Sequence, residues 1–219
     1  NRPFFMPTSI HPKFARAMVN LTGVESGMVL DPLCGTGGNL IEAERMGFSC
    51  AGVEVDPRVA SGAAVNLRKH AAGGKWDVIL GDGTHAPFKS SSFDAVVSDL
   101  PYGRSTTMTD GRDALYQSVI YEIKRLLKKG AAACIVAPAP LSLPGRKDIR
   151  IEKIYELRVH RSLTRLFYRL RPQVPLSRRA SLPLSRLLLF PARPLSLFPR
   201  TFPARALPLF PLPAASRAF

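Results

Sequence analysis

The chain has 219 residues and a formal net charge of +15, a balance that is typical of nucleic-acid-binding proteins. The charge is concentrated near one end: no Asp or Glu follows Glu156 while twelve arginines do, so residues 157–219 carry +12. Residues 1–156 carry only about +3. The total charge is therefore weak evidence for an RNA partner, and no apolar run approaches the ~18 residues of a membrane span.

The cysteines and the first residue bear on the class of protein. Cys34, Cys50 and Cys134 show no C-x-x-C spacing, which argues against a zinc site and favours the reduced thiols of a cytoplasmic protein. There is no sign of a signal peptide. Because the chain begins with Asn1, we expect it to be a fragment with something missing upstream.

The first predicted elements are an extended segment and a helix. Residues 2–10 are punctuated by proline, and Phe4 and Phe5 are expected to anchor them to the domain. A helix is predicted from Pro12, a residue that suits the first turn, to Gly23. Its apolar residues recur at helical spacing and should face the core.

Residues 28–46 read as a strand, a glycine loop and a helix, with Asp31 at the end of the strand. The loop glycines, Gly35 and Gly37, would let the backbone approach a ligand, and the helix N-terminus offers it N–H groups. The Asp31 carboxylate would repel a dinucleotide pyrophosphate and attract a cation. The pattern therefore favours S-adenosylmethionine, whose ammonium and sulfonium groups are both positive.

A second strand is predicted over residues 49–56 and a helix over residues 57–70. Glu54 lies seventeen residues after Gly37, near the spacing expected of a carboxylate that binds ribose hydroxyls. Asp56 is expected to cap the helix that follows it.

A third strand is predicted over residues 76–83, with Asp82 near its end. There Asp82 could accept a hydrogen bond from an adenine amine. An ordinary turn at Asp82-Gly83 is the alternative, and the residues alone do not separate the two.

The fourth strand, predicted over residues 93–97, leads into Asp99, Leu100, Pro101 and Tyr102. Open α/β sheets bind ligands at this end of their strands. Asp99 and the Leu100 carbonyl could accept the two hydrogens of an amine on a base, while Tyr102 stacks on the ring. Such acceptors would restore the nitrogen lone pair, and the carboxylate would stabilise the developing cation. The alternative is a strand-ending Asp beside a Pro-Tyr turn.

The remaining elements complete the expected architecture. They are a polar loop at 103–111, a helix over 113–129, a fifth strand over 131–137 and a strand pair over 149–158 and 162–170. The sequence thus predicts an α/β, doubly wound, Rossmann-like and mostly parallel sheet with a C-terminal antiparallel strand pair. Residues 1–170 are expected to form this domain. Ten prolines between Pro172 and Phe219 predict a disordered or aberrant tail over residues 171–219, with a basic RNA-binding arm as the alternative.

Five motifs together resemble the archaeal tRNA guanosine-10 N2-methyltransferase family, within the class I S-adenosylmethionine-dependent amino-methyltransferases. They are Arg2-Pro-Phe-Phe-x-Pro-Thr-Ser, Asp31-Pro-x-Cys-Gly-Thr-Gly-Gly, Gly52-Val-Glu-Val-Asp-Pro, Asp99-x-Pro-Tyr-Gly-Arg-Ser and His160-Arg-Ser-Leu-Thr-Arg. They extend from Arg2 to about Arg165, essentially one catalytic domain. The family's N-terminal tRNA-binding THUMP region has no counterpart in these 219 residues.

The resemblance implies methylation of the guanine 2-amino group of tRNA, once or twice, by a cytoplasmic enzyme that uses S-adenosylmethionine and no metal. It assigns the cofactor to Asp31, Cys34, Gly35, Gly37, Glu54, Asp82 and Gly83, and catalysis to Asp99, Leu100, Pro101 and Tyr102. Leu100 stands where the family usually has Pro, so Asp99 loses a backbone restriction. The alternatives are the same chemistry on rRNA guanine or DNA adenine, and a non-enzymatic cofactor-binding or RNA-binding remnant.

Overall fold

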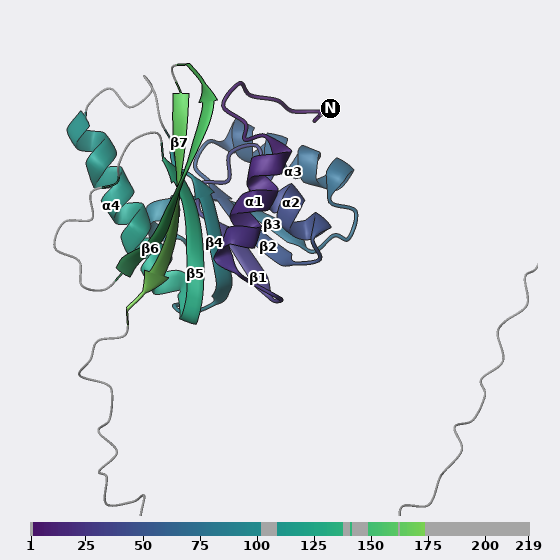
Figure 1. Cartoon of the computed structure of the whole chain (residues 1–219). Helices are drawn as coiled ribbons and strands as arrows, with labels where there is room; N and C mark the ends of the chain where they lie inside the picture. Colours follow the sequence, from purple (N-terminus) through teal and green to yellow (C-terminus); the bar gives the residue numbers. More distant parts are fainter. Residues whose placement is uncertain (1, 102–108, 138–140, 142–148, 162, 174–219) are drawn as a thin grey trace, which may run out of the picture. The chain divides into compact units, whose positions relative to one another are not determined.

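The computed structural model describes residues 2–101, 109–137, 141, 149–161 and 163–173. Their strands form a seven-stranded sheet in the order β3-β2-β1-β4-β5-β7-β6. The strands are β1 Met28–Asp31, β2 Ser49–Glu54, β3 Trp76–Leu80, β4 Phe93–Asp99, β5 Leu127–Ala137, β6 Ile149–His160 and β7 Leu163–Pro172. Strands β1 to β5 are parallel, whereas β7 pairs antiparallel with both β5 and β6. The predicted fold class is confirmed (Figure 1).

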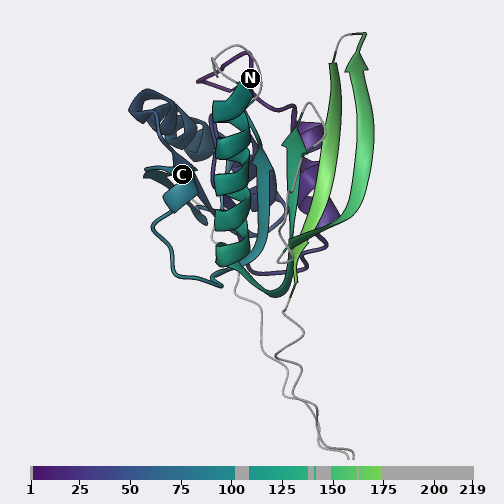
Figure 2. The ribbon, with the colours of Figure 1, turned by 90° about the vertical axis from the view of Figure 1, so that its left-hand side faces the viewer.

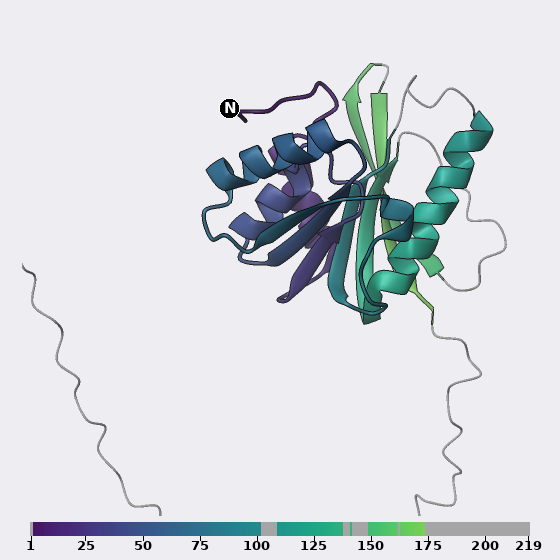
Figure 3. The same cartoon turned by 180° about the vertical axis from the view of Figure 1, so that it is seen from behind.

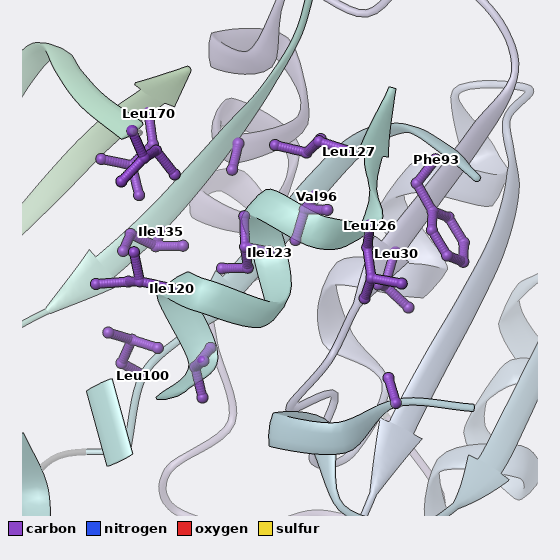
Figure 4. Packing of buried hydrophobic residues seen from close by; sticks show 14 of the residues in the cluster. Leu30, Phe93, Val96, Leu100, Ile120, Ile123, Leu126, Leu127, Ile135 and Leu170 are labelled. Atoms are coloured by element: carbon purple, nitrogen blue, oxygen red, sulfur yellow. The ribbon is translucent and has the colours of Figure 1, made fainter. Parts of the chain in front are cut away.

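Helices cover both faces of the sheet. They are α1 Pro12–Thr22, α2 Gly38–Arg45, α3 Pro57–His70 and α4 Thr109–Leu126, with a short 3-10 helix, η1, at Gly83–His85. Helices α1, α2 and α3 pack on one face and α4 on the other (Figure 2). Under α4, Ile120 and Ile123 lie against Val96 and Ile135 of the sheet, in a buried cluster (Figure 4).

The chain reverses its direction of travel across the sheet between β1 and β4. From β1 it moves outward through β2 and β3, then returns so that β4 lies beside β1 (Figure 3). Ligands of open α/β sheets bind at such a switch point, outside the carboxyl ends of the strands. Asp31 ends β1 and Asp99 ends β4, so the fold brings both carboxylates to that place.

Two helices begin where the sequence predicts, for an identifiable local reason. Both α1 and α3 have Pro at the first helical position, where the missing N–H has no intrahelical acceptor to lose. The Asp56 carboxylate accepts from the N–H groups of Arg58 and Val59 at 2.8 and 3.2 Å. The predicted capping role of Asp56 is therefore confirmed.

The predicted junction between the long helix and the fifth strand is wrong by several residues. The helix starts earlier, at Thr109, and ends at Leu126, while Leu127 already pairs with Phe93 in the sheet. Lys128 binds both carboxylate oxygens of Asp94 at 2.9 Å, and Gly130 has φ 82°, which accommodates the irregular register there. Lys128, Lys129 and Gly130 therefore belong to β5, although the sequence predicts that the helix continues to residue 129.

Smaller differences concern the strand ends. Strand β4 continues through Asp99, so this residue ends the strand and does not follow it. Strand β3 stops at Leu80, before Asp82, and β6 and β7 extend the predicted strand pair to His160 and Pro172. Residues 174–219 lie outside the described residues, so the predicted domain boundary and tail stay predictions. Within the described part of the chain, no helix is long and apolar enough to cross a membrane.

Candidate active site

A cavity of about 700 Å³ lies at the switch point, a volume that suits a small-molecule ligand. Its wall contains most of the residues that the sequence singles out. They are Asp31, Cys34, Gly35, Glu54, Asp82, Gly83, Asp99, Leu100 and Pro101. Gly37 does not line it, and Tyr102 lies outside the described residues, as does most of the predicted polar loop.

The glycine loop owes its shape to backbone conformations that other residues rarely adopt. Gly35 has φ 52° and Gly37, at the N-cap of α2, has φ 80°. The loop is held to β2, because the Cys34 N–H donates to the Val53 carbonyl at 2.9 Å. Gly83 approaches the same loop so closely that a Cβ there would clash with the Pro32 carbonyl. Gly35 and Gly83 thus bring two separate segments together at the cavity wall.

Glu54 connects the glycine loop to the end of β2. Its carboxylate accepts from the Gly35 N–H at 3.0 Å and from the Asp56 N–H at 2.9 Å. Two backbone donors thus fix the side chain at the cavity wall, where it can still accept from a ligand, because a carboxylate has about four lone-pair positions.

Asp31 is the most deeply buried carboxylate of the site, with 1 % of its surface exposed. It accepts from Ser98 Oγ at 2.9 Å, from Asn39 Nδ2 at 2.8 Å and from the Leu33 N–H at 3.1 Å. Burial nevertheless raises the pKa of Asp31 to about 6, from its ordinary 3.8, because removal of water disfavours the charge more than these donors support it. A cationic ligand would restore the charged form.

Asn39 is a site residue that the sequence does not reveal. Its Nδ2 group binds Asp31, while its Oδ1 atom is buried and has no hydrogen-bond partner within the described structure. Asn39 also lines the cavity. A buried carbonyl oxygen without a donor is expensive to maintain, so it indicates a ligand with an N–H group at this point. The sequence carries no clear signal for this role, because α2 holds three other polar residues, Glu42, Glu44 and Arg45.

Asp82 differs from Asp31 in being exposed. Its Oδ1 atom accepts from both the backbone N–H and the hydroxyl of Thr84 at 2.8 Å, so it caps η1. The backbone hydrogen bond from Thr84 is the main reason that the pKa of Asp82 is lowered. Asp82 therefore does form the turn that the sequence allows. Because its side chain also lines the cavity, it is placed where a hydrogen bond to an adenine amine can form as well.

Asp99, Leu100 and Pro101 are anchored by backbone contacts. The Leu100 N–H donates to the Val136 carbonyl at 3.0 Å, and Tyr116 Oη donates to the Pro101 carbonyl at 2.7 Å. Proline at position 100 could not make the first of these bonds. The Leu100 side chain is fully buried in the cluster under α4 (Figure 4). A hydrogen bond and apolar packing thus replace the restriction that a proline would impose.

The N-terminal segment covers the glycine loop and contributes to the cavity wall. Asn66 of α3, which is fully buried, accepts from the Phe4 N–H at 2.9 Å and donates to the carbonyls of Phe4 and Thr36 at 2.8 and 3.0 Å. Ser9 and Thr36 join their hydroxyls at 2.9 Å. The predicted anchoring is confirmed for Phe4, whereas Phe5 is 69 % exposed.

The charges of the wall decide which kind of ligand fits. Five carboxylates face the cavity, from Asp31, Glu54, Asp56, Asp82 and Asp99, and no Lys, Arg or His is among the described residues that line it. An acidic wall favours a cation and opposes a pyrophosphate. S-adenosylmethionine fits this set of acceptors, since its ammonium group would donate to the Asn39 oxygen and the Asp31 carboxylate.

The doubly wound sheet is the fold of Rossmann-like methyltransferases. The model of the UPF0020 family, described as an RMKL-like methyltransferase domain, matches residues 1–166, and the chain belongs to this family. A solved structure of TrmN from Thermus thermophilus has the same fold, with a TM-score of 0.65 and 19 % identity. That likeness covers 76 % of this chain and 50 % of TrmN.

Two curated relatives are more similar in sequence. A tRNA (guanine(10)-N2)-dimethyltransferase of Methanothermobacter thermautotrophicus is 41 % identical over 169 residues, which are 75 % of this chain and 50 % of the relative. A protein of the same description from Pyrococcus abyssi is 37 % identical, covering 76 % of this chain and 51 % of the relative. The chain spans about half the length of these relatives.

Proposed function

We propose that the chain transfers a methyl group from S-adenosylmethionine to the 2-amino group of a guanine in tRNA, at position 10. One observation carries this proposal: Asp99 and the Leu100–Pro101 segment open into the same acidic cavity as the glycine loop. A cofactor site and an amine-binding element therefore share one wall. The alternative of a guanine in rRNA or an adenine in DNA keeps the same chemistry.

The cofactor would be held by residues already in place. Asp31 and Asn39 receive its ammonium, Glu54 its ribose hydroxyls and Asp82 its adenine amine. The bound sulfonium supplies an electrophilic methyl group. The chain contributes orientation and electrostatics, and no covalent intermediate with the protein is needed.

Asp99 and the Leu100 carbonyl act on the attacking amine. Both are acceptors, so they hold the two amine hydrogens and favour the tetrahedral nitrogen whose lone pair points at the methyl group. As the nitrogen–carbon bond forms, positive charge grows on the amine, and the Asp99 carboxylate stabilises it. The proton that the nitrogen then loses leaves through Asp99 or water.

The choice of tRNA is supported by the two archaeal relatives, both described as tRNA (guanine(10)-N2)-dimethyltransferases. Because the chain spans half of each relative, the substrate is inferred from the matching half alone. From the proposed tRNA substrate we also infer a cytoplasmic location.

The direct test uses the chain, methyl-labelled S-adenosylmethionine and an unmodified tRNA transcript, followed by digestion to nucleosides and mapping of the label. We expect N2-methylguanosine or its dimethyl form at position 10. Label on rRNA or on DNA adenine, offered in parallel reactions, would favour the alternative substrates. Cofactor binding by calorimetry without transfer to any of them would indicate a remnant that only binds cofactor.

Replacing Asp82 by alanine tests the adenine contact. The contact is expected to be worth ~1 kcal/mol, about fivefold in affinity for S-adenosylhomocysteine, because Asp82 is exposed and water competes for it. The matched ligand is S-inosylhomocysteine, which has a carbonyl in place of the adenine amine. Calorimetry should show no weakening for that ligand. Equal losses for both ligands would mean that Asp82 acts only through the turn it caps.

A further inference from the structure

The last motif of the sequence, residues 160–165, has no role so far, and its final residue lies beside Asp99. Arg165 Nη1 is 3.5 Å from Asp99 Oδ2, and only 12 % and 14 % of the two side chains are exposed. A nearly buried arginine is thus paired with the carboxylate that is proposed to bind the amine.

The register of the sheet explains this contact. Asp99 lies opposite Val136 of β5, and Val136 lies opposite Phe167 of β7. Arg165 is two residues from Phe167, so it projects from the same face, one step beyond the end of β4. The pairing therefore follows from the topology and places a guanidinium next to a carboxylate at the edge where the base would bind.

The two groups have opposite hydrogen-bonding character. A carboxylate only accepts, and a guanidinium only donates, through five N–H groups in a fixed fork that can serve Asp99 and a second acceptor together. The Watson–Crick edge of guanine presents donors at N2 and N1 and an acceptor at O6. Adenine presents an amine donor and an N1 acceptor and has no carbonyl, so it offers the arginine nothing at the place of O6.

We propose that Arg165 donates to O6 of the target guanine while Asp99 binds its 2-amino group, so that the pair selects guanine over other bases. This inference rests on the proposed function. An arginine present only to orient Asp99 would oppose catalysis, because its charge repels the positive charge that grows on the amine. A hydrogen bond from the guanidinium to O6 would instead bind the base, which offsets that repulsion.

The test is a cycle of two proteins and two transcripts. The transcripts differ only at the target nucleotide, which is guanosine or 2-aminopurine riboside; the latter keeps the 2-amino group but has hydrogen in place of O6 and no hydrogen on N1. Single-turnover transfer by the unaltered chain should be ~100-fold faster on guanosine, since a site built to bond a substrate group rejects the analogue without it. Arg165→Met should lose most of that ratio, mainly through a slower reaction on guanosine.

Arg169→Met is the matched control. Arg169 lies on the same strand and face and is 3.2 Å from Glu152, away from Asp99. It should keep the ratio of the unaltered chain. Equal slowing of both transcripts by Arg165→Met would overturn the proposal and leave Arg165 as a positioning residue, and an unchanged ratio would overturn it as well.

Two further outcomes, a variant that does not fold and a chain that transfers no methyl group, also have a defined meaning. If Arg165→Met does not fold, as judged by circular dichroism and cofactor binding, the unaltered chain decides: equal rates on both transcripts overturn the proposal. Absence of transfer to the guanosine transcript contradicts the proposed function itself, and the inference with it.

Discussion

Replacing Asp99 by alanine is expected to slow methyl transfer by ~100-fold or more, with much less change in cofactor affinity. The carboxylate interacts most strongly with the amine once positive charge develops there, so its loss affects the transition state more than the bound state. Asp99→Asn should fall between the two, because it keeps one acceptor and loses the charge. The measurement is single-turnover transfer to one tRNA transcript with the cofactor saturating.

Asp94→Asn provides the control for this experiment. Asp94 lies on the same strand, β4, but at the opposite end, where it binds Lys128 and the Met28 N–H. It should transfer at the rate of the unaltered chain once its folding has been checked. Transfer by Asp99→Ala at that same rate would reduce the strand end to an ordinary turn and remove the chemical basis of the proposed function.

Replacing Asp31 by asparagine is expected to stabilise the ligand-free protein at pH 7.5 while weakening cofactor binding by ~10-fold or more. The pKa of Asp31 is about 6 in the folded protein and has an ordinary value of 3.8. The folded state thus binds the proton more tightly, and stability falls as the pH rises from ~4 to ~6. Two pKa units correspond to ~3 kcal/mol, lost in full above pH 6.

Asparagine removes the buried charge and keeps the shape. The Asn39 amide can turn over to offer its unpaired oxygen to the new amide group. Denaturation with urea should show a gain of roughly 1–3 kcal/mol at pH 7.5 and almost none at pH 4, where Asp31 is already protonated. Cofactor binding weakens because the cationic ammonium loses its buried counter-charge.

Ser98→Ala separates charge from hydrogen bonding at this site. It removes the hydroxyl that donates to Asp31 and leaves the carboxylate in place. We expect it to destabilise the protein at pH 7.5, opposite in sign to Asp31→Asn. If Asp31→Asn is also less stable at pH 7.5, the buried carboxylate does not oppose folding. That result would contradict the proposal that the charge of Asp31 requires a cationic ligand.

The elements that the sequence predicts well have local signals. The boundaries of α1 and α3 follow from proline at the first helical position and from capping groups. The start of β5 does not, because Leu127 continues the apolar pattern of α4 and belongs to the strand only through its pairing with Phe93. That pairing is a tertiary contact that periodicity does not encode.

The candidate site divides in the same way. Asp31, Glu54 and Asp99 are recognisable because acidic residues at the ends of apolar strands share one edge of a parallel sheet. Asn39 carries no such signal, and the motif that ends at Arg165 gives no sign of the contact with Asp99, because both roles come from where neighbouring elements direct the side chains. Arg165 lies 66 residues after Asp99 and reaches it only because β7 returns antiparallel beside β5.

The most direct measurement of the central claim compares two tRNA transcripts that differ by one amino group. Inosine at the methylated position keeps every feature of guanosine except the 2-amino group that Asp99 is proposed to bind. With saturating cofactor and excess enzyme, we predict transfer to the guanosine transcript and none to the inosine transcript. Comparable transfer to both would show that the methyl group goes to another atom and would contradict the account.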